Sequence, residues 1–146
     1  MSGPLTHSPA QILREAIIAL GLGTDPDDSM AWPVYATNKP DSPDTLVVTF
    51  DAVGRLDGKT SPDREVQEFH GARVVVRHAR ESTGFTKARS IQIGLDGLYD
   101  QQVQIDATDY LIHAISRDDS VSNLGREQGN ARRLFSFNCR MTVRQL

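Results

Sequence analysis

The chain has 146 residues, a formal net charge of −3 and an apolar fraction of 38%, with 11 glycines and 7 prolines. This length predicts one domain over residues 1–146, which buries roughly 68–70% of the surface that the unfolded chain exposes. The acidic balance argues against a protein that grips nucleic acid by its phosphates, and a lone cysteine excludes an internal disulfide. No apolar run approaches the length of a membrane span, and the first ten residues lack signal-peptide character, so a reducing, cytoplasmic setting without a membrane partner is expected.

The first predicted element is a helix from Ser8 to Leu20. Ser8 is a favourable N-cap, Pro9 suits the first helical position, and Gln11 completes a capping box. Apolar residues recur at helical spacing at Leu13, Ala16, Ile17 and Leu20. The glycines at positions 21 and 23 can each end the helix in the left-handed conformation.

Residues 24–44 are rich in proline and aspartate, and four prolines exclude a long helix there. Residues 32–36 are expected to form a short edge strand. The aspartates lie in turns, where their side chains bond nearby backbone amides and are ordinarily solvated. Three of them are also candidate subunit-interface residues: Asp25, Asp27 and Asp28.

Alternating patterns predict strands over residues 46–51 and 72–77. The intervening residues, 54–71, show little pattern and are expected to form a long loop of the functional or mobile kind. A helix is expected over residues 83–99, because Ala88, Ile91, Leu95 and Leu98 recur at steps of three and four. Strands are then expected over 101–106 and 109–116, followed by a charged loop from Arg117 to Arg132.

The clearest strand is the last, in the stretch "ARRLFSFNCRMTV" at residues 131–143. Every second residue is apolar, which predicts one dry face: Phe135, Phe137, Cys139, Met141 and Val143. The elements together predict an α+β fold, with a mainly antiparallel sheet of about 4–6 strands and two helices packed on one face.

The opposite face of two strands carries arginines at Arg73, Arg77, Arg140 and Arg144. If the strands are neighbours, these residues form one basic face on an acidic protein. Such a face is either an ordinary solvated sheet face or a subunit interface, where arginine is enriched. Both interpretations remain open at this point.

Catalytic, cofactor and metal motifs are not found. The four histidines have no partner at metal-ligand spacing, and no nucleophile motif accompanies them. The Gly58-Lys59-Thr60 stretch lacks the spacing and the strand-to-helix context of a phosphate-binding loop. The expectation is therefore no catalytic residue, no cofactor, no metal and no enzymatic activity.

The C-terminal stretch "NLGREQGNARRLFSFNCRMTV" resembles the ending of small neck proteins of long-tailed bacteriophages, the tail terminator or minor capsid (head-tail joining) proteins. That ending is a "LGRD"-like loop, a glycine and a basic residue, and a phenylalanine-rich strand with "FN". The matching residues are Leu124, Gly125, Arg126, Glu127 in place of the usual aspartate, Gly129, Arg132, Phe135, Phe137 and Asn138. Upstream, "SPDTLVVTF", "GARVVVRHARES" and "ILREAIIAL" resemble the family's other core elements, while residues 25–44 and 54–71 depart from its pattern.

The resemblance implies a small subunit that forms a homo-oligomeric ring, expected to be a hexamer, in the tail or neck of a virion assembled in the host cytoplasm. The implied partners are the major tail tube protein below and a head-completion or connector protein above. DNA would pass through the lumen without specific binding. The alternatives are a head-completion or connector adaptor protein of the same neck and, less favoured, a small enzyme whose site is not visible in the sequence.

Two segments of opposite charge are candidates for the ring contact. Residues 24–44 carry five aspartates and one lysine, a net charge of −4, and residues 126–146 carry five arginines and one glutamate, a net charge of +4. Because a head-to-tail ring needs two different complementary patches on each subunit, these segments are expected to meet across a ring interface or a ring-ring contact. The candidate residues of the basic segment are Arg126, Glu127, Arg132, Arg133 and Arg140.

Overall fold

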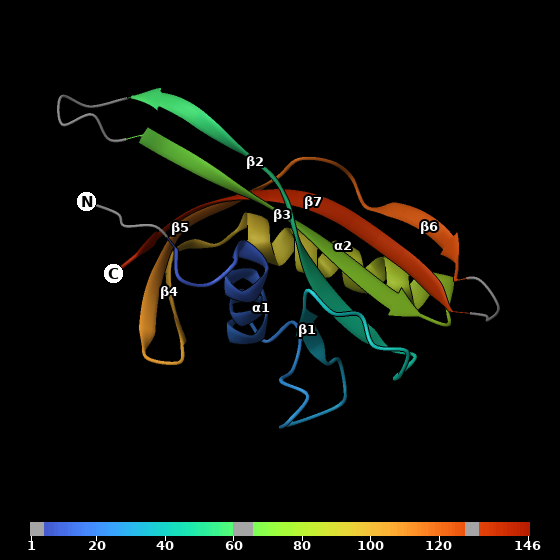
Figure 1. The fold of residues 1–146 in the computed structure, drawn as a ribbon. Coiled ribbons are helices and arrows are strands. Elements are labelled where there is room, and N and C mark those ends of the chain that lie inside the picture. Colours follow the sequence, from blue (N-terminus) through green and yellow to red (C-terminus); the bar gives the residue numbers. More distant parts are fainter. Residues whose placement is uncertain (1–4, 60–65, 128–131) are drawn as a thin grey trace.

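A computed structural model describes residues 5–59, 66–127 and 132–146 of the chain. Within these ranges there are two helices and one seven-stranded sheet (Figure 1). The helices are α1 (Pro9–Ala19) and α2 (Glu81–Asp96), and the strands are β1 (Val34–Ala36), β2 (Leu46–Lys59), β3 (Val66–His78), β4 (Tyr99–Ile105), β5 (Thr108–Arg117), β6 (Ser122–Arg126) and β7 (Arg133–Gln145).

The sheet runs in the order β1-β2-β3-β7-β5-β4, and β6 pairs with one end of β7. The β1–β2 pair is parallel, and the other described pairs are antiparallel. Both helices cover the same face of the sheet (Figure 1). The predicted α+β class is confirmed, and the sheet has one strand more than the expected range.

Helix α1 begins as the sequence predicts. The Ser8 side chain accepts a hydrogen bond from the backbone N–H of Gln11, and the Gln11 side chain accepts one from the Ser8 N–H, so the capping box is complete. The buried face of the helix packs against the sheet through Ala10, Ile12, Leu13, Ala16 and Ile17. Gly21 has a φ of +72°, the left-handed conformation expected after a helix end.

Helix α2 lies close to β7 because Gly84 has no side chain. A Cβ added at Gly84 would lie 2.4 Å from Cε2 of Phe135, which no real contact allows. The predicted apolar stripe is buried in the core, at Ala88, Ile91, Leu95 and Leu98. The helix ends three residues before the predicted boundary, because Gly97 caps it and Tyr99 already belongs to β4.

The dry face of β7 is confirmed, since all five alternating apolar residues of the strand are buried. Burial, reinforced by nearby aspartates, raises the pKa of the Cys139 thiol to about 12, so this cysteine is a small core residue with an inert thiol. The opposite face is not uniformly wet. Ser136 is buried there and accepts a hydrogen bond from Nη2 of Arg73 at 3.2 Å.

The predicted loop over residues 54–71 is wrong for most of its length. Strand β2 continues to Lys59 and β3 begins at Val66, and the two form one long hairpin that extends beyond the rest of the sheet (Figure 1). Residues 60–65 lie outside the described ranges. The pairing shifts register between Ala52 and Arg55 and again between Leu56 and Lys59, and such bulges break the two-residue alternation by which a strand is recognised.

The predicted loop from Arg117 to Arg132 is also wrong in part, because it contains β6. This strand pairs with the start of β7 and is mostly exposed, so its sequence has no apolar face that would reveal it. A register shift accompanies Gly125, whose φ of +83° is a conformation that favours glycine. Gly129 of the C-terminal motif lies outside the described residues.

The segment before α1 is fixed to the end of the sheet near the C-terminus (Figure 1). The backbone N–H of Thr6 donates to the Gln145 side chain at 2.9 Å, and the N–H of His7 donates to the buried Tyr110 hydroxyl at 2.9 Å. In the described ranges, neither helix is long and apolar enough to cross a membrane.

Candidate functional site

Charged side chains are concentrated on the sheet face that carries no helix, called the outer face below. Its residues alternate with those of the core, and in β3 and β7 they include Arg73, Ser136, Asn138, Arg140 and Arg144. Arg73 lies opposite Asn138 in the register of β3 with β7, and Arg140 lies opposite Gly71, so the two arginines are diagonal neighbours. The structure therefore brings Arg73 and Arg140 together, as expected if the strands were neighbours.

Arg77 is on the same face but is not solvated. Its side chain is 1% exposed. The Arg77 guanidinium donates to the carbonyl oxygen of Pro43 and lies 3.3 Å from the Glu127 carboxylate. The segment before β2 covers this end of the outer face, so Arg77 acts as an internal anchor for that segment.

Glu127 joins three parts of the chain. Its carboxylate contacts Arg77 of β3, Lys39 of the segment before β2 at 3.4 Å, and Arg132, which immediately precedes β7, at 3.1 Å. Arg132 in turn donates to the carbonyl oxygen of Asp41 and lies 3.5 Å from the carboxylate of Asp44. We call this set the Glu127 network: Lys39, Asp41, Pro43, Asp44, Arg77, Glu127 and Arg132.

The Glu127 network shows that part of the charge of the two segments is paired within one subunit. One end of the acidic segment, residues 39–44, contacts the basic segment inside the same subunit. Arg133 is also engaged, 3.7 Å from Glu81 of α2. Arg126 and Arg144 are exposed and form no ion pair with any described residue. The inter-subunit role of these segments stays a prediction, and it now concerns their remaining charges.

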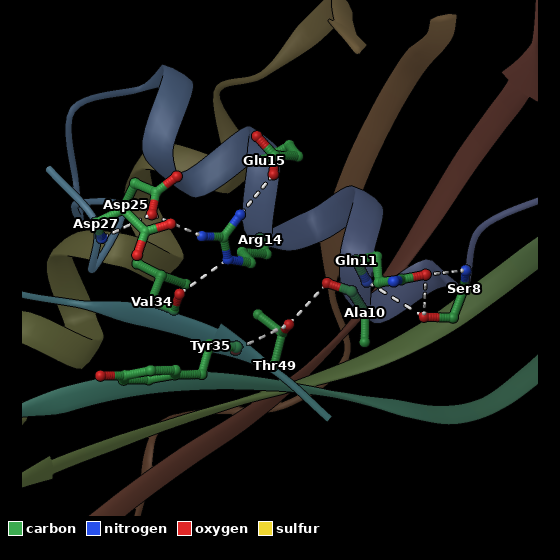
Figure 2. Close-up of polar contacts among 10 residues, drawn as sticks. All are labelled: Ser8, Ala10, Gln11, Arg14, Glu15, Asp25, Asp27, Val34, Tyr35 and Thr49. Atoms are coloured by element: carbon green, nitrogen blue, oxygen red, sulfur yellow. Dashed lines mark hydrogen bonds and ion pairs between the residues drawn. The ribbon is translucent and has the colours of Figure 1, made fainter. Parts of the chain in front are cut away.

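The other end of the acidic segment, residues 24–32, packs beside α1 (Figure 2). Arg14 of α1 donates from Nε to the carbonyl oxygen of Val34 at 2.8 Å, and its guanidinium lies 2.6 Å from Glu15 and 3.5 Å from Asp25. Asp25 also caps its own turn, since its carboxylate accepts from the N–H of Asp27 at 3.0 Å. Asp25 is thus a structural residue, as aspartates in turns usually are.

Asp27 and Asp28 are exposed beside this ordered turn. They have no ion-pair partner among the described residues. A shallow cleft of about 480 Å³ separates the turn from α1 and β1, with Arg14, Tyr35 and Asn38 among its lining residues. The described lining residues do not combine a nucleophile with a paired acid and base. The cleft therefore suits a protein contact better than a catalytic site.

The described residues hold one arrangement that resembles a proton relay. Nδ1 of His7 is 2.6 Å from the Tyr110 hydroxyl, and Nε2 of His7 is 3.5 Å from Asp106. Tyr110 is fully buried in the core, so no substrate reaches its hydroxyl. The arrangement fastens the N-terminal segment to β5. Over the same described ranges, no group of three or more His, Cys, Asp or Glu side chains is placed to hold a metal ion.

Sequence reasoning missed the roles of Lys39, Asp44 and Arg14. Each pairs with a residue distant in the chain, and single-sequence patterns carry no signal for such pairs. It also did not predict that Arg77 is buried, because strand alternation gives the face of a residue and not what covers that face.

Comparison with known proteins gives a likeness of fold. No protein-family model and no curated protein matches the sequence. A chain in the solved structure of the virion of a native gene transfer agent particle is similar in fold, with a TM-score of 0.53 and 16% sequence identity. The match covers 76% of this chain and 78% of that chain. At this identity the likeness shows that the two chains share a fold.

Proposed function

We propose that this chain is a structural subunit of a virion, placed at the neck of a tailed, phage-like particle. The observation that carries the proposal is the fold shared with a chain of the gene transfer agent virion over 76% of this chain. The C-terminal motif supports the same class independently, because Leu124, Gly125 and Arg126 match the loop of phage neck proteins. The subunit is a building part and not an enzyme.

Within the neck, the chain acts as a tail terminator that assembles into a ring, a hexamer, on top of the tail tube. Its partners are its own copies, the major tail tube protein and a head-completion or connector protein, and DNA passes through the lumen without specific binding. A terminator needs two unlike surfaces. One surface must bind the end of the tail tube, and the opposite surface must not bind further tail tube protein. The helix-covered face and the arginine-bearing outer face of the sheet are unlike in this sense.

The first test is the assembly state of the purified protein. Sedimentation at several concentrations, together with negative-stain imaging, should reveal closed rings of about six subunits in the size range of a neck component. A protein that stays monomeric at high concentration, with or without tail tube protein, would contradict the ring. The position of the ring in the neck is tested separately by loss of the gene, which is considered at the end of the Discussion.

A further inference from the structure

Arg73 lies on the outer face, opposite Asn138 of β7, and has no acidic partner in the part of the chain that the structure describes. No carboxylate of the described residues lies within ion-pair distance of it. Its one hydrogen bond to a described residue goes from Nη2 to the Ser136 hydroxyl, and its Nε is buried without a partner. A half-buried guanidinium whose donors are incompletely satisfied is costly unless an acceptor completes it.

The carboxylates near Arg73 on the outer face are already paired with other residues. Arg140, its diagonal neighbour, lies 2.5 Å from Asp118, which neutralises it. Arg144, farther along the same face of β7, is exposed and has no ion pair among the described residues. Asp119 is already used, because it accepts two hydrogen bonds from Asn138. Arg73 and Arg144 are therefore two separate positive charges on the outer face, about 20 Å apart along β7 at roughly 3.3 Å per residue, and neither has a carboxylate partner among the described residues.

The same chain presents matching carboxylates on the turn at residues 24–32. Asp27 and Asp28 are exposed without ion pairs, and Met30 beside them is 52% exposed. The turn is held in one shape, since the N–H groups of Asp28 and Ser29 both donate to the Asp25 carbonyl oxygen and the Thr24 hydroxyl donates to the Ser29 carbonyl oxygen. A turn ordered in advance loses little conformational entropy when it binds.

These two patches cannot meet within one subunit. The turn is fastened to α1, which covers the core face of the sheet (Figure 2), whereas Arg73 points from the opposite face. Helix α1 lies on the face of the sheet opposite the outer face (Figure 1). Two complementary patches on opposite sides of one subunit generate a head-to-tail contact, which closes into a ring when the rotation allows it.

We propose that the turn carrying Asp27 and Asp28 docks on the outer face of a second copy of this chain, where its carboxylates pair with Arg73. The inference rests on the proposed ring and names the two surfaces that build it. It also assigns different tasks to the charges of the acidic segment. Asp41 and Asp44 hold the Glu127 network inside the subunit, while Asp27 and Asp28 contact the neighbour.

The test uses charge reversal on each side of the contact in the full-length protein. Arg73→Glu alone, and Asp27→Arg with Asp28→Arg, should each raise the concentration for half-assembly by roughly tenfold or more, because like charges then face each other. Arg80→Glu is the control, since Arg80 is exposed at the start of α2, outside both patches, and should assemble as the unaltered protein does. Circular dichroism of each variant verifies the fold.

Mixing the two reversed variants gives the decisive readout. Arg73→Glu is acidic at both the turn and position 73, and the Asp27→Arg, Asp28→Arg variant is basic at both. Each variant therefore repels its own copies and attracts the other. An equimolar mixture should co-assemble into rings in which the two variants alternate. Such rescue cannot come from a misfolded variant. Assembly of Arg73→Glu at the normal concentration, or a mixture of folded variants that fails to assemble, would overturn this contact while leaving the ring intact. An unaltered protein that never assembles would overturn the ring and the contact together.

Discussion

Glu127 is the residue whose ion pairs hold the segment before β2 and the chain just before β7 against β3. Arg77 is 1% exposed, and Glu127 is the carboxylate that compensates its charge. Because removal of one partner leaves a buried charge uncompensated, Glu127→Gln should lower the free energy of unfolding by about 3 kcal/mol. Urea denaturation measures the loss. Glu15→Gln is the matched control, since its ion pair with Arg14 is more exposed and should contribute less than about 1 kcal/mol.

The same network allows a second-site check. If the cost of Glu127→Gln arises from the stranded charge of Arg77, then adding Arg77→Met should recover about 1 kcal/mol or more, because an apolar side chain needs no counter-ion. A double variant that is less stable than Glu127→Gln would show that the contacts of Glu127 with Lys39 and Arg132 dominate. In that case the segment before β2 would be held mainly by the contacts of Glu127 beside β6 and β7, and less by Arg77 of β3.

Phe137 tests the assignment of the two faces of β7. The side chain is 1% exposed in the core beneath the helices, so Phe137→Ala should lower the free energy of unfolding by about 3–5 kcal/mol. Thr142→Ala is the control on the outer face of the same strand and should change it by less than about 0.5 kcal/mol. A denaturation midpoint of Phe137→Ala that is no lower than that of Thr142→Ala would contradict this assignment of the inner and outer faces. Ser136 is unsuitable as the control, because it is buried and bonded to Arg73.

At the scale of elements, α2 lies so close to β7 that replacing a glycine of this helix by alanine should destabilise the protein, opposite to the usual effect. Replacing a helical glycine by alanine ordinarily stabilises a protein by about 0.4–1 kcal/mol. At Gly84 the new Cβ would meet the Phe135 ring, so Gly84→Ala should instead lower the free energy of unfolding by about 1–3 kcal/mol. Gly97→Ala, where the nearest atom is 3.7 Å away, should be neutral or stabilising by thermal denaturation. A stabilised Gly84→Ala would mean that α2 sits farther from the sheet.

The elements that sequence predicted are those whose signals are local. The capping box of α1 and the five alternating apolar residues of β7 need only their own segment to be recognised, and both are confirmed. The extended part of β2 was missed because bulges interrupt its alternation, and β6 was missed because it is mostly exposed and has no apolar face. The Glu127 network was missed for another reason, since Lys39 and Glu127 are joined only by the fold.

At the scale of the whole molecule, a ring built on exposed charges should weaken with salt. The Debye length falls from about 10 Å at 0.1 M to about 3 Å at 1 M ionic strength, which screens exposed pairs far more than buried ones. Sedimentation should therefore find smaller species at high salt, while the unfolding midpoint changes little. Making Arg132 and Arg133 both glutamate would be a poor test of assembly, because these residues form ion pairs inside the subunit. Assembly that is equally strong at both salt concentrations would point to an apolar ring contact.

Loss of the gene tests the place of the ring in the particle. A tail tube is a stack of rings, and its top surface always offers one more binding site for tube protein. Growth stops only when a subunit binds that surface and presents a different face above, so a lysate without the terminator should contain headless tails of abnormal length.

Electron micrographs of such lysates separate the neck components. Overlong headless tails are the expected result, and complementation with the intact gene should restore joined particles of normal length. Tails of normal length beside heads that leak DNA would contradict the terminator and favour a head-completion protein, because the tube would then have been capped by another ring. A lysate of intact virions would exclude the chain from the neck, since a joint that is missing cannot be bypassed by the parts on either side of it.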